Sequence, residues 1–348
     1  METFWFIALT LMIGIYVVLD GFDIGAGIIH LFSAKNDTER RTVLNAIGPV
    51  WDGNEVWLLA GGGILFFAFP KAYASSFSGF YMPLIIVLWL LIGRGIGIEL
   101  RKHIDSPLWK QFWDVIFSIS SILLAIFFGA ALGNVIRGVP LDQEGYFYEP
   151  LWTTFTVVPN AGILDTFTVL MGLVGLFTLT AHGGNFIAMK TEGELQIRAR
   201  KISGIFNWLV LASSIAAIIS VTAIKPQVWA NYSIHAWGYI FPVLGLLGML
   251  GMIIFRFIQR DGWAFVSSCI FIIFMLVSTA FGAYPNVLPS STNPEYSLTI
   301  YNASAGEYGL RVGTYWWFIG LILAIIYFVY LFYSFRGKVK ITSDDEGY

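Results

Sequence analysis

Long apolar runs, separated by short charged or turn-rich segments, extend along the whole chain. Each run is long enough to cross a hydrocarbon core of about 30 Å as a helix that rises about 1.5 Å per residue. The pattern therefore predicts an all-α polytopic membrane protein with nine transmembrane helices. The predicted spans are residues 4–30, 47–69, 77–100, 112–136, 161–189, 202–224, 235–258, 262–284 and 312–335.

Composition agrees with this class of protein. The 348 residues are 57% hydrophobic and 12% charged, and a soluble domain of this length does not need so apolar a surface. The net charge of −2 argues against nucleic acid as a partner. The single cysteine, Cys269, excludes an internal disulfide and a thiolate metal cluster. No linker divides the chain, so we expect one membrane domain over residues 1–348.

Basic residues are distributed unevenly among the connections between the predicted spans. Fifteen lie in alternate connections and the C-terminal tail, against four on the opposite side. The fifteen are Lys35, Arg40, Arg41, Arg101, Lys102, Lys110, Lys190, Arg198, Arg200, Lys201, Arg256, Arg260, Arg336, Lys338 and Lys340. The four are Lys71, Arg137, Lys225 and Arg311. Because basic residues accumulate in cytoplasmic loops, we expect the N-terminus outside and the C-terminus in the cytoplasm.

The run from Gly48 to Leu58 places two acids, Asp52 and Glu55, at the start of an apolar segment. An ionisable group within a span costs roughly 2.5–3.5 kcal/mol on insertion scales, so it indicates function by default. The two acids are three residues apart and share a helix face. Trp51 and Trp57 flank the pair, and Asn54 adds a hydrogen-bonding group. The alternative is that Asp52 only caps the helix by accepting free N–H groups.

Other ionisable residues fall at the same predicted depth. These are Asp20 and Asp23 in the first span, Arg94 and Glu99 in the third, and Asp114 at the start of the fourth. With Asp52 and Glu55, the predicted cytoplasmic half contains six acids and one base. An arginine can hold one or two carboxylates by bidentate hydrogen bonds. Chains of intramembrane acids are typical of proton relays. Sodium binding and a purely structural polar cluster are the competing interpretations.

The histidines argue against a haem in this chain. A b-type haem usually needs two axial ligands that face each other across helices. Of the four histidines, only His182 lies well inside a span, and no partner for it is evident. We therefore predict no metal ligands here. Asp165, near the outer surface, is expected to be a helix cap.

Seven segments spread over most of the chain match one known family. They are Asp20–Gly25, Gly48–Leu58, Arg94–Arg101, His182–Gly183, Lys190–Leu195, Pro289–Thr292 and Ser297–Ala303. In these segments the chain resembles subunit II of the cytochrome bd-type quinol oxidases, the membrane oxygen reductases of bacterial respiration. The run with Trp51 and Trp57 and the loop that starts at Lys190 are the most specific matches.

The resemblance implies two four-helix bundles, in residues 1–136 and 161–284, and a peripheral helix at 312–335. It implies a location in the bacterial cytoplasmic (inner) membrane and a partner, subunit I, that carries haem b and haem d. Subunit I would oxidise quinol and reduce oxygen to water. This chain would have no catalytic residues; it would stabilise subunit I and supply cytoplasmic protons. A small single-helix accessory subunit, membrane lipid and a structural quinone are further partners that the resemblance allows.

The site residues expected from charge and resemblance together form one set. Proton transfer is assigned to Asp20, Asp23, Asp52, Glu55, Arg94, Glu99 and Asp114, with Trp51, Asn54 and Trp57 in support. Two other functions stay open. An autonomous proton- or sodium-coupled transporter would more often show matching broken helices and midplane sites in both halves. A passive scaffold would use the same charges only to hold helices together.

Overall fold

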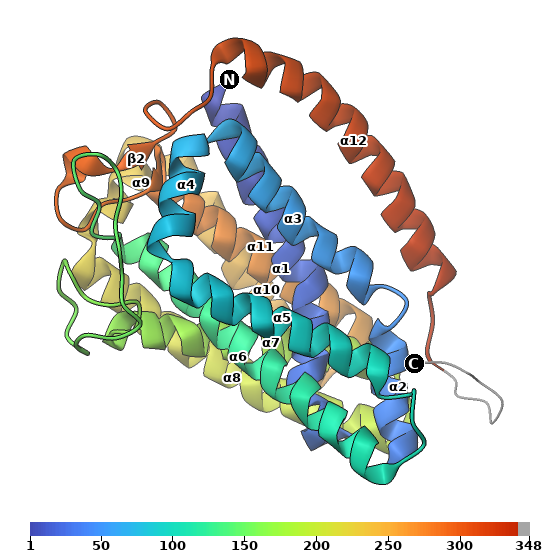
Figure 1. The fold of residues 1–348 in the computed structure, drawn as a ribbon. Helices are drawn as coiled ribbons and strands as arrows, with labels where there is room; N and C mark the ends of the chain where they lie inside the picture. Colours follow the sequence, from blue (N-terminus) through green and yellow to red (C-terminus); the bar gives the residue numbers. More distant parts are fainter. Residues whose placement is uncertain (340–348) are drawn as a thin grey trace.

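The computed structural model describes residues 1–339, which form long helices packed side by side (Figure 1). Within these residues, eight helices are long and apolar enough to cross a membrane, and a bent pair makes a ninth span if it is counted as one. The predicted all-α membrane fold is confirmed. Lys340, part of the predicted cytoplasmic tail, lies outside the described residues.

The elements follow one another as a series of helices with one small sheet. The α-helices are α1 (Glu2–Ser33), α2 (Asp37–Ile47), α3 (Trp51–Ala68), α4 (Pro70–Gly79), α5 (Tyr81–Leu100), α6 (Pro107–Arg137), α7 (Thr166–Lys190), α8 (Gly193–Ile224), α9 (Ala230–Ile234), α10 (Ile240–Phe257), α11 (Asp261–Ala283) and α12 (Glu307–Ser334). Short 3₁₀ turns cover Pro226–Trp229, Ala236–Tyr239 and Pro294–Tyr296. Strands β1 (Asn286–Leu288) and β2 (Leu298–Thr299) pair antiparallel, with Asn286 opposite Thr299.

Helix ends differ from the predicted spans where polar residues continue a helix beyond its apolar part. The clearest case is the predicted span 202–224, which is the second part of α8. In the first turns of α8, Arg200 Nε donates to Asp261 Oδ1 at 2.8 Å, and Gln196 Nε2 donates to Asp261 Oδ2 at 2.9 Å. These bonds attach the polar part of α8 to the start of α11, which hydropathy alone does not register.

The predicted start of the third span at residue 77 is wrong. The helix α3 ends at Ala68, and α4 leaves it at an angle of 119°. Proline lacks the backbone N–H and its ring clashes with the carbonyl group four residues earlier, so α3 cannot continue straight through Pro70. After a second break at Phe80, the spanning helix α5 begins at Tyr81. The residues between α3 and α5 are therefore mostly helical, as the bent continuation α4.

The helix α1 lies at the centre of the fold. It packs against α3, α6, α7 and α11; α5 packs on α6, α8 on α7, and α10 on α11 (Figure 1). The helices thus form two neighbouring groups, with α12 along the outside of α1 and α3. The boundaries 1–136 and 161–284 for two separate bundles stay a prediction. One end of the molecule contains α2 and the α5–α6 loop and is called the Arg101 end; the other contains α9 and the strands and is called the Arg137 end.

The two groups meet where α1 and α7 touch backbone to backbone. A Cβ atom added at Gly25 would lie 2.7 Å from both the Cα and the N atom of Gly183, and closer still to the carbonyl oxygen of Leu179. Small residues allow such close approach of membrane helices. The crossing fixes the position of α1, which carries Asp20 and Asp23.

The Arg137 end is closed by the segment between α6 and α7. Arg137 Nη2 donates to Glu149 Oε1 at 2.7 Å, and Arg137 Nη1 donates to Asp165. Asp165 is the N-cap of α7, where its side chain accepts from the Thr168 N–H at 2.8 Å, so the predicted cap is confirmed. Burial raises the pKa of Glu149 to about 7, against its partner Arg137.

Candidate functional site

Arg94 lies at the centre of a buried charged cluster made by α1, α3 and α5. Its Nη1 donates to Asp20 Oδ1 at 2.6 Å, and its Nη2 lies 3.3 Å from Glu55 Oε2. Asp20 and Arg94 are fully buried, whereas the Glu55 side chain is 26% exposed. Two charges withdrawn from water need such close geometry because each loses several kcal/mol of hydration. Arg94 therefore holds two carboxylates, as its charge predicts.

Asn54 brings Asp23 to the same cluster. The Asn54 amide Nδ2 donates to Asp23 Oδ2 at 2.7 Å and to the carbonyl oxygen of Leu19 at 3.3 Å, and both side chains are fully buried. The remaining oxygens, Asp23 Oδ1 and Asp20 Oδ2, accept no hydrogen bond within residues 1–339. Three carboxyl groups share one guanidinium, so the cluster has acceptor atoms free to take up protons.

Asp114 lies in a second cluster, at the Arg101 end. Arg101 Nε donates to Asp114 Oδ1 at 2.6 Å, and Arg40 Nη1 donates to Oδ2 at 3.0 Å. His30 Nε2 lies 2.7 Å from the same Oδ1. Arg101 Nη2 also donates to Asp37 Oδ1 at 2.7 Å, and the Asp37 side chain is 51% exposed. This cluster connects buried Asp114 with the surface.

The single cluster of seven ionisable groups predicted from the sequence is therefore wrong in its arrangement. Asp114 has its own partners, and the side chains of Asp52 and Glu99 form no hydrogen bond or ion pair with the described residues. Glu99 follows Arg94 by five residues, which places it roughly 140° away around the helix. Asp52 is exposed in the first turn of α3. The N-cap of that helix is Val50, so the alternative in which Asp52 caps it is also wrong.

The two tryptophans of α3 attach this helix to different neighbours. A Cβ atom added at Gly95 of α5 would lie 3.3 Å from the Trp51 ring, so glycine allows the indole to lie against α5. Trp57 is buried, and its ring centroid lies 5.2 Å from that of Phe328 in α12. Both residues support the packing around the Arg94 cluster.

His182 has no ring nitrogen free for iron. Its Nδ1 lies 2.6 Å from Ser268 Oγ and its Nε2 lies 2.9 Å from the carbonyl oxygen of Val18. The ring also stacks on Phe265, at 5.0 Å between centroids. The described residues contain no group of three His, Cys, Asp or Glu side chains arranged for a metal ion. The His182 ring is therefore held by contacts within the chain.

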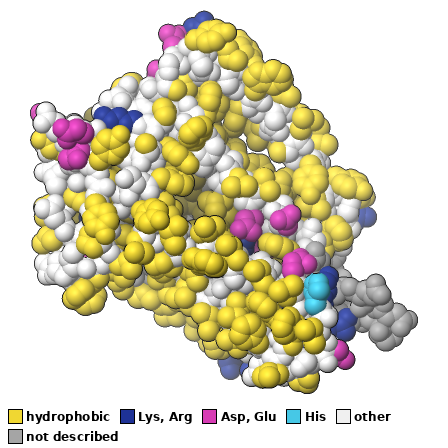
Figure 2. Space-filling view, in the orientation of Figure 1, with side chains coloured by type: hydrophobic (Ala, Val, Ile, Leu, Met, Phe, Trp, Pro, Cys, Tyr) yellow, Lys and Arg dark blue, Asp and Glu magenta, His cyan; other side chains and the backbone are white. Residues whose placement is uncertain are grey.

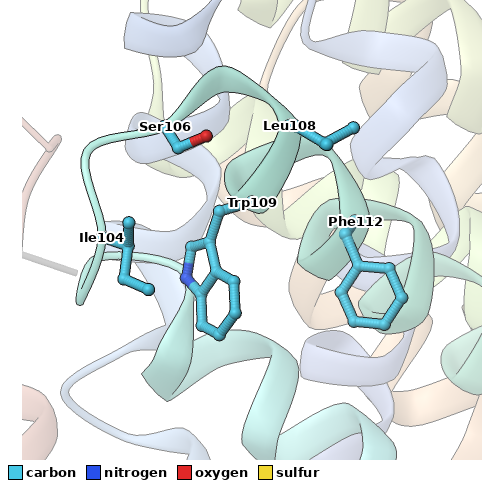
Figure 3. A pocket seen from close by; sticks show the side chains of 5 residues that line it. All are labelled: Ile104, Ser106, Leu108, Trp109 and Phe112. Atoms are coloured by element: carbon cyan, nitrogen blue, oxygen red, sulfur yellow. The ribbon is translucent and has the colours of Figure 1, made fainter.

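Two pockets lie apart from the charged clusters. One, of about 460 Å³, is at the Arg101 end between the α5–α6 loop and the start of α6 (Figure 3). Its lining residues are Ile104, Ser106, Leu108, Trp109 and Phe112. The other, of about 590 Å³, lies between α1, α3 and α12 and is lined by apolar and aromatic residues that include Trp5, Ile64, Phe67, Val312 and Trp317. Neither has a titratable lining group suited to acid–base chemistry, apart from the Tyr308 phenol.

The face formed by α3, α5 and α12 is largely hydrophobic, and acidic side chains reach it between α3 and α5 (Figure 2). Exposed apolar residues of α3 and α5 include Leu59, Phe66, Leu88 and Trp89. Carboxylates within an apolar membrane surface are costly. The buried acids therefore lead to carboxylates on an otherwise apolar face.

Four residues of the second cluster were not assigned a site role from the sequence. Arg101, Arg40 and Asp37 read as ordinary loop charges, and His30 as a helix end. His30 does lie seven residues after Asp23, which places both on one face of α1. That spacing is the signal that could have identified it.

Comparison with known proteins covers nearly the whole chain. Residues 1–335 match the family model described as cytochrome bd terminal oxidase subunit II. The chain is 32% identical to the probable cytochrome oxidase subunit 2 of Haemophilus influenzae, over 96% of this chain and 94% of that protein. It is 30% identical to the cytochrome bd-I ubiquinol oxidase subunit 2 of Escherichia coli, with the same coverage.

A third relative and a solved structure agree with these matches. The cytochrome bd ubiquinol oxidase subunit 2 of Bacillus subtilis is 30% identical, over 97% of this chain and 96% of that protein. The bd oxidase structure from Geobacillus thermodenitrificans matches with a TM-score of 0.76 and 19% identity, over 96% of this chain and 98% of that chain. At that identity the structural match shows the fold, and the family follows from the sequence matches. The chain belongs to the cytochrome bd terminal oxidase subunit II family.

Proposed function

We propose that this chain is the haem-free subunit of a bd-type quinol:oxygen oxidoreductase, which stabilises the haem-bearing subunit I and supplies it with cytoplasmic protons. The family makes the chain a component of a cytochrome bd oxidase and a multi-pass protein of the bacterial inner membrane. The complex implied by that family contains haem and uses quinol. Haem in that complex would supply the chemistry of oxygen reduction, and the residues of this chain would hold and move protons.

The observation that carries this proposal is the Arg94 cluster. Asp20 and Asp23 are fully buried, and Glu55 continues the cluster to the face between α3 and α5. A string of carboxyl groups from a protein interior to a surface within the membrane is suited to proton transfer. The predicted orientation places the Arg101 end in the cytoplasm, so protons would enter there and leave toward α3 and α5.

The partner is expected on the same face. Exposed Asp52 and partly exposed Glu55 lie within an apolar surface, and their cost in lipid is removed if another protein covers them. Subunit I would therefore receive protons where it contacts α3 and α5. The groove between α1, α3 and α12 is the position we assign to a lipid chain or the tail of a structural quinone, because apolar and aromatic residues form most of its lining.

The His182 geometry supports a chain without haem. Both ring nitrogens already have polar partners, and His182 is the histidine deepest within a span. Haem b and haem d are thus assigned to subunit I. An autonomous transporter is not favoured, because the buried acids inside the spanning helices of residues 1–339 are Asp20, Asp23 and Asp114, in α1 and α6, and the chain belongs to an oxidase family.

The test compares Asp23→Asn and Glu55→Gln with Asp105→Asn in the assembled complex. Asp105 is at the Arg101 end, its side chain is 96% exposed and it touches neither cluster, so it controls for loss of a carboxylate. We expect quinol-oxidase turnover per haem to fall at least roughly tenfold in the two site variants, in line with the loss of a proton-transfer group. Haem content and yield of complex should stay normal, and Asp105→Asn should behave as wild type.

A different pattern would contradict the proposal. Normal turnover per haem together with a low yield of complex would make the cluster structural, as in a passive scaffold. A purified chain that has no haem-bearing partner and couples solute flux to protons or sodium would instead indicate a transporter.

A further inference from the structure

A stripe of buried polar groups runs along one face of α1. Asp20, Asp23 and His30 are fully buried and, with Gly27, follow one another at spacings of three, four and three residues. Such spacings place residues on one side of a helix. The two charged clusters described above are therefore connected by a single helix face, and Gly27 is the only position of the stripe without a polar side chain.

A hydroxyl group from α6 fills the place beside Gly27. A Cβ atom added there would lie 2.7 Å from Ser121 Cβ and 3.0 Å from the Phe117 ring, and closer still to Ser121 Oγ. Ser121 Oγ donates to the carbonyl oxygen of Phe117 at 2.7 Å, and a hydroxyl oxygen can also accept. Gly27 is about 6 Å along the helix axis from Asp23 and about 4.5 Å from His30. The Ser121 hydroxyl is thus at a depth along α1 between those of Asp23 and His30, and it hydrogen-bonds neither of them.

His30 has the chemistry of a connecting group. Its Nε2 contacts Asp114 Oδ1 at 2.7 Å, whereas its Nδ1 is buried and has no hydrogen-bond partner within residues 1–339. Imidazole can accept a proton at one nitrogen while it releases one from the other. The charged groups that act on it are Asp114 from α6, Arg101 at the end of α5 and Arg40 from α2. Through Arg101 the cluster reaches exposed Asp37.

We propose that His30 and the Ser121 hydroxyl form the path by which protons pass from the Asp114 cluster to Asp23; this rests on the proton-supply function proposed above. A proton on an Asp114 oxygen moves to His30 Nε2, and the proton on Nδ1 leaves toward Ser121 Oγ once side-chain rotation closes the gap between them, because Nδ1 has no hydrogen-bond partner within residues 1–339. The hydroxyl takes that proton and releases its own toward Asp23. Each hop breaks one bond to hydrogen and forms one, and rotation of the imidazole restores its first tautomer. The path begins at the Arg101 end, not at Asp52.

Two neighbouring serines of α6 provide a matched test. Ser121 faces α1, whereas Ser120 is also buried but faces α5, where a Cβ atom added at Gly93 would lie 2.8 Å from its Oγ. We would prepare the complex with Ser121→Ala or Ser120→Ala, react the reduced enzyme with oxygen, and follow proton uptake with a pH-sensitive dye in H₂O and D₂O. The expected result is uptake slowed about tenfold, with a larger solvent isotope effect, in Ser121→Ala alone.

His30→Gln is the second variant, because the amide can still bond Asp114 but cannot relay a proton through the ring. Slow uptake with normal haem content in both His30→Gln and Ser121→Ala supports the path. Normal uptake in Ser121→Ala overturns it, and so does equal slowing by Ser120→Ala. Asp23→Asn distinguishes the proton-supply function from the path through Ser121. If Asp23→Asn slows uptake while Ser121→Ala does not, the chain supplies protons but this path is wrong. If Asp23→Asn also leaves uptake unchanged, the proton-supply function and the path through Ser121 are both wrong.

Discussion

The contact between Gly25 and Gly183 predicts a large effect from one methyl group. In Gly25→Ala the new Cβ atom would be placed 2.7 Å from two backbone atoms of Gly183, where ordinary contacts are 3.4 Å or longer. The obstructing atoms belong to the α7 backbone, and the Leu179 carbonyl oxygen is nearer still, so no side chain can rotate away. The helices α1 and α7 must separate by at least about 0.7 Å, since the repulsion rises steeply at shorter distances.

The expected cost follows from two opposing contributions. Overpacking of a tight contact typically costs about 1–3 kcal/mol. Replacing glycine by alanine inside a helix favours the helix by about 0.8–1 kcal/mol. A second variant, Gly14→Ala, isolates the favourable contribution, because Gly14 is on the same helix and a Cβ atom there meets nothing within 4 Å. The two variants should therefore differ by the whole overpacking cost.

The measurement is the thermal midpoint of the purified complex in detergent, together with its haem content. We expect Gly25→Ala to have a Tm at least about 2 °C lower than Gly14→Ala. Turnover should also fall, since a shift of α1 moves Asp20 relative to Arg94. If the two variants have equal Tm values and equal haem content, the close crossing of α1 and α7 does not hold the two helix groups together.

Two further predictions concern charged groups. Arg94→Gln leaves buried Asp20 without its cation and should cost about 3–5 kcal/mol, and adding Asp20→Asn should restore part of the loss; additive losses in Tm across this double-mutant cycle would contradict the ion pair. Burial raises the pKa of Glu149 from 4.5 to about 7 in the folded chain, so the folded state binds this proton more tightly than the unfolded state. Stability should therefore fall as pH rises from about 4.5 to 7. Glu149→Gln should flatten the Tm profile between pH 5 and 8, whereas exposed Glu144→Gln in the same segment should not; an unchanged profile in Glu149→Gln would exclude Glu149 as its source.

Hydropathy predicted the spans well because burial in lipid dominates where each helix lies. It could not predict polar helix turns such as the start of α8, since these depend on a distant partner, Asp261. The break at Pro70 was visible in the sequence, but its angle depends on how α4 packs at the Arg137 end. Hydropathy and proline positions thus predict which segments form helices, but they predict the ends of those helices less well.

In the candidate site, too, some features could be predicted from the sequence and others depend on how the helices pack. The excess of acids over bases in the first four predicted spans, and the pairing of Arg94 with carboxylates, could be predicted from charge alone. A lone buried arginine requires carboxylate partners. That Asp114 belongs with His30 and Arg101, and not with Arg94, depends on where α1, α2 and α6 meet in space. The order of charges along the sequence does not show that the two clusters are separate, about 10 Å apart along α1. Their roles in proton transfer stay a prediction.

The helix α12 differs from every other candidate span, because none of its most apolar window is buried against the rest of residues 1–339. Aromatic contacts hold it, such as Trp317 on Phe4 and Phe328 on Trp57, and beyond its end Lys190 Nζ donates to the carbonyl oxygen of Phe335 at 2.7 Å. A helix with so little internal burial contributes little to the folding of its own chain. Sequence drift in α12 should then be limited by whatever surrounds it in the membrane, and the cost of a poor substitution should appear during biogenesis of the complex.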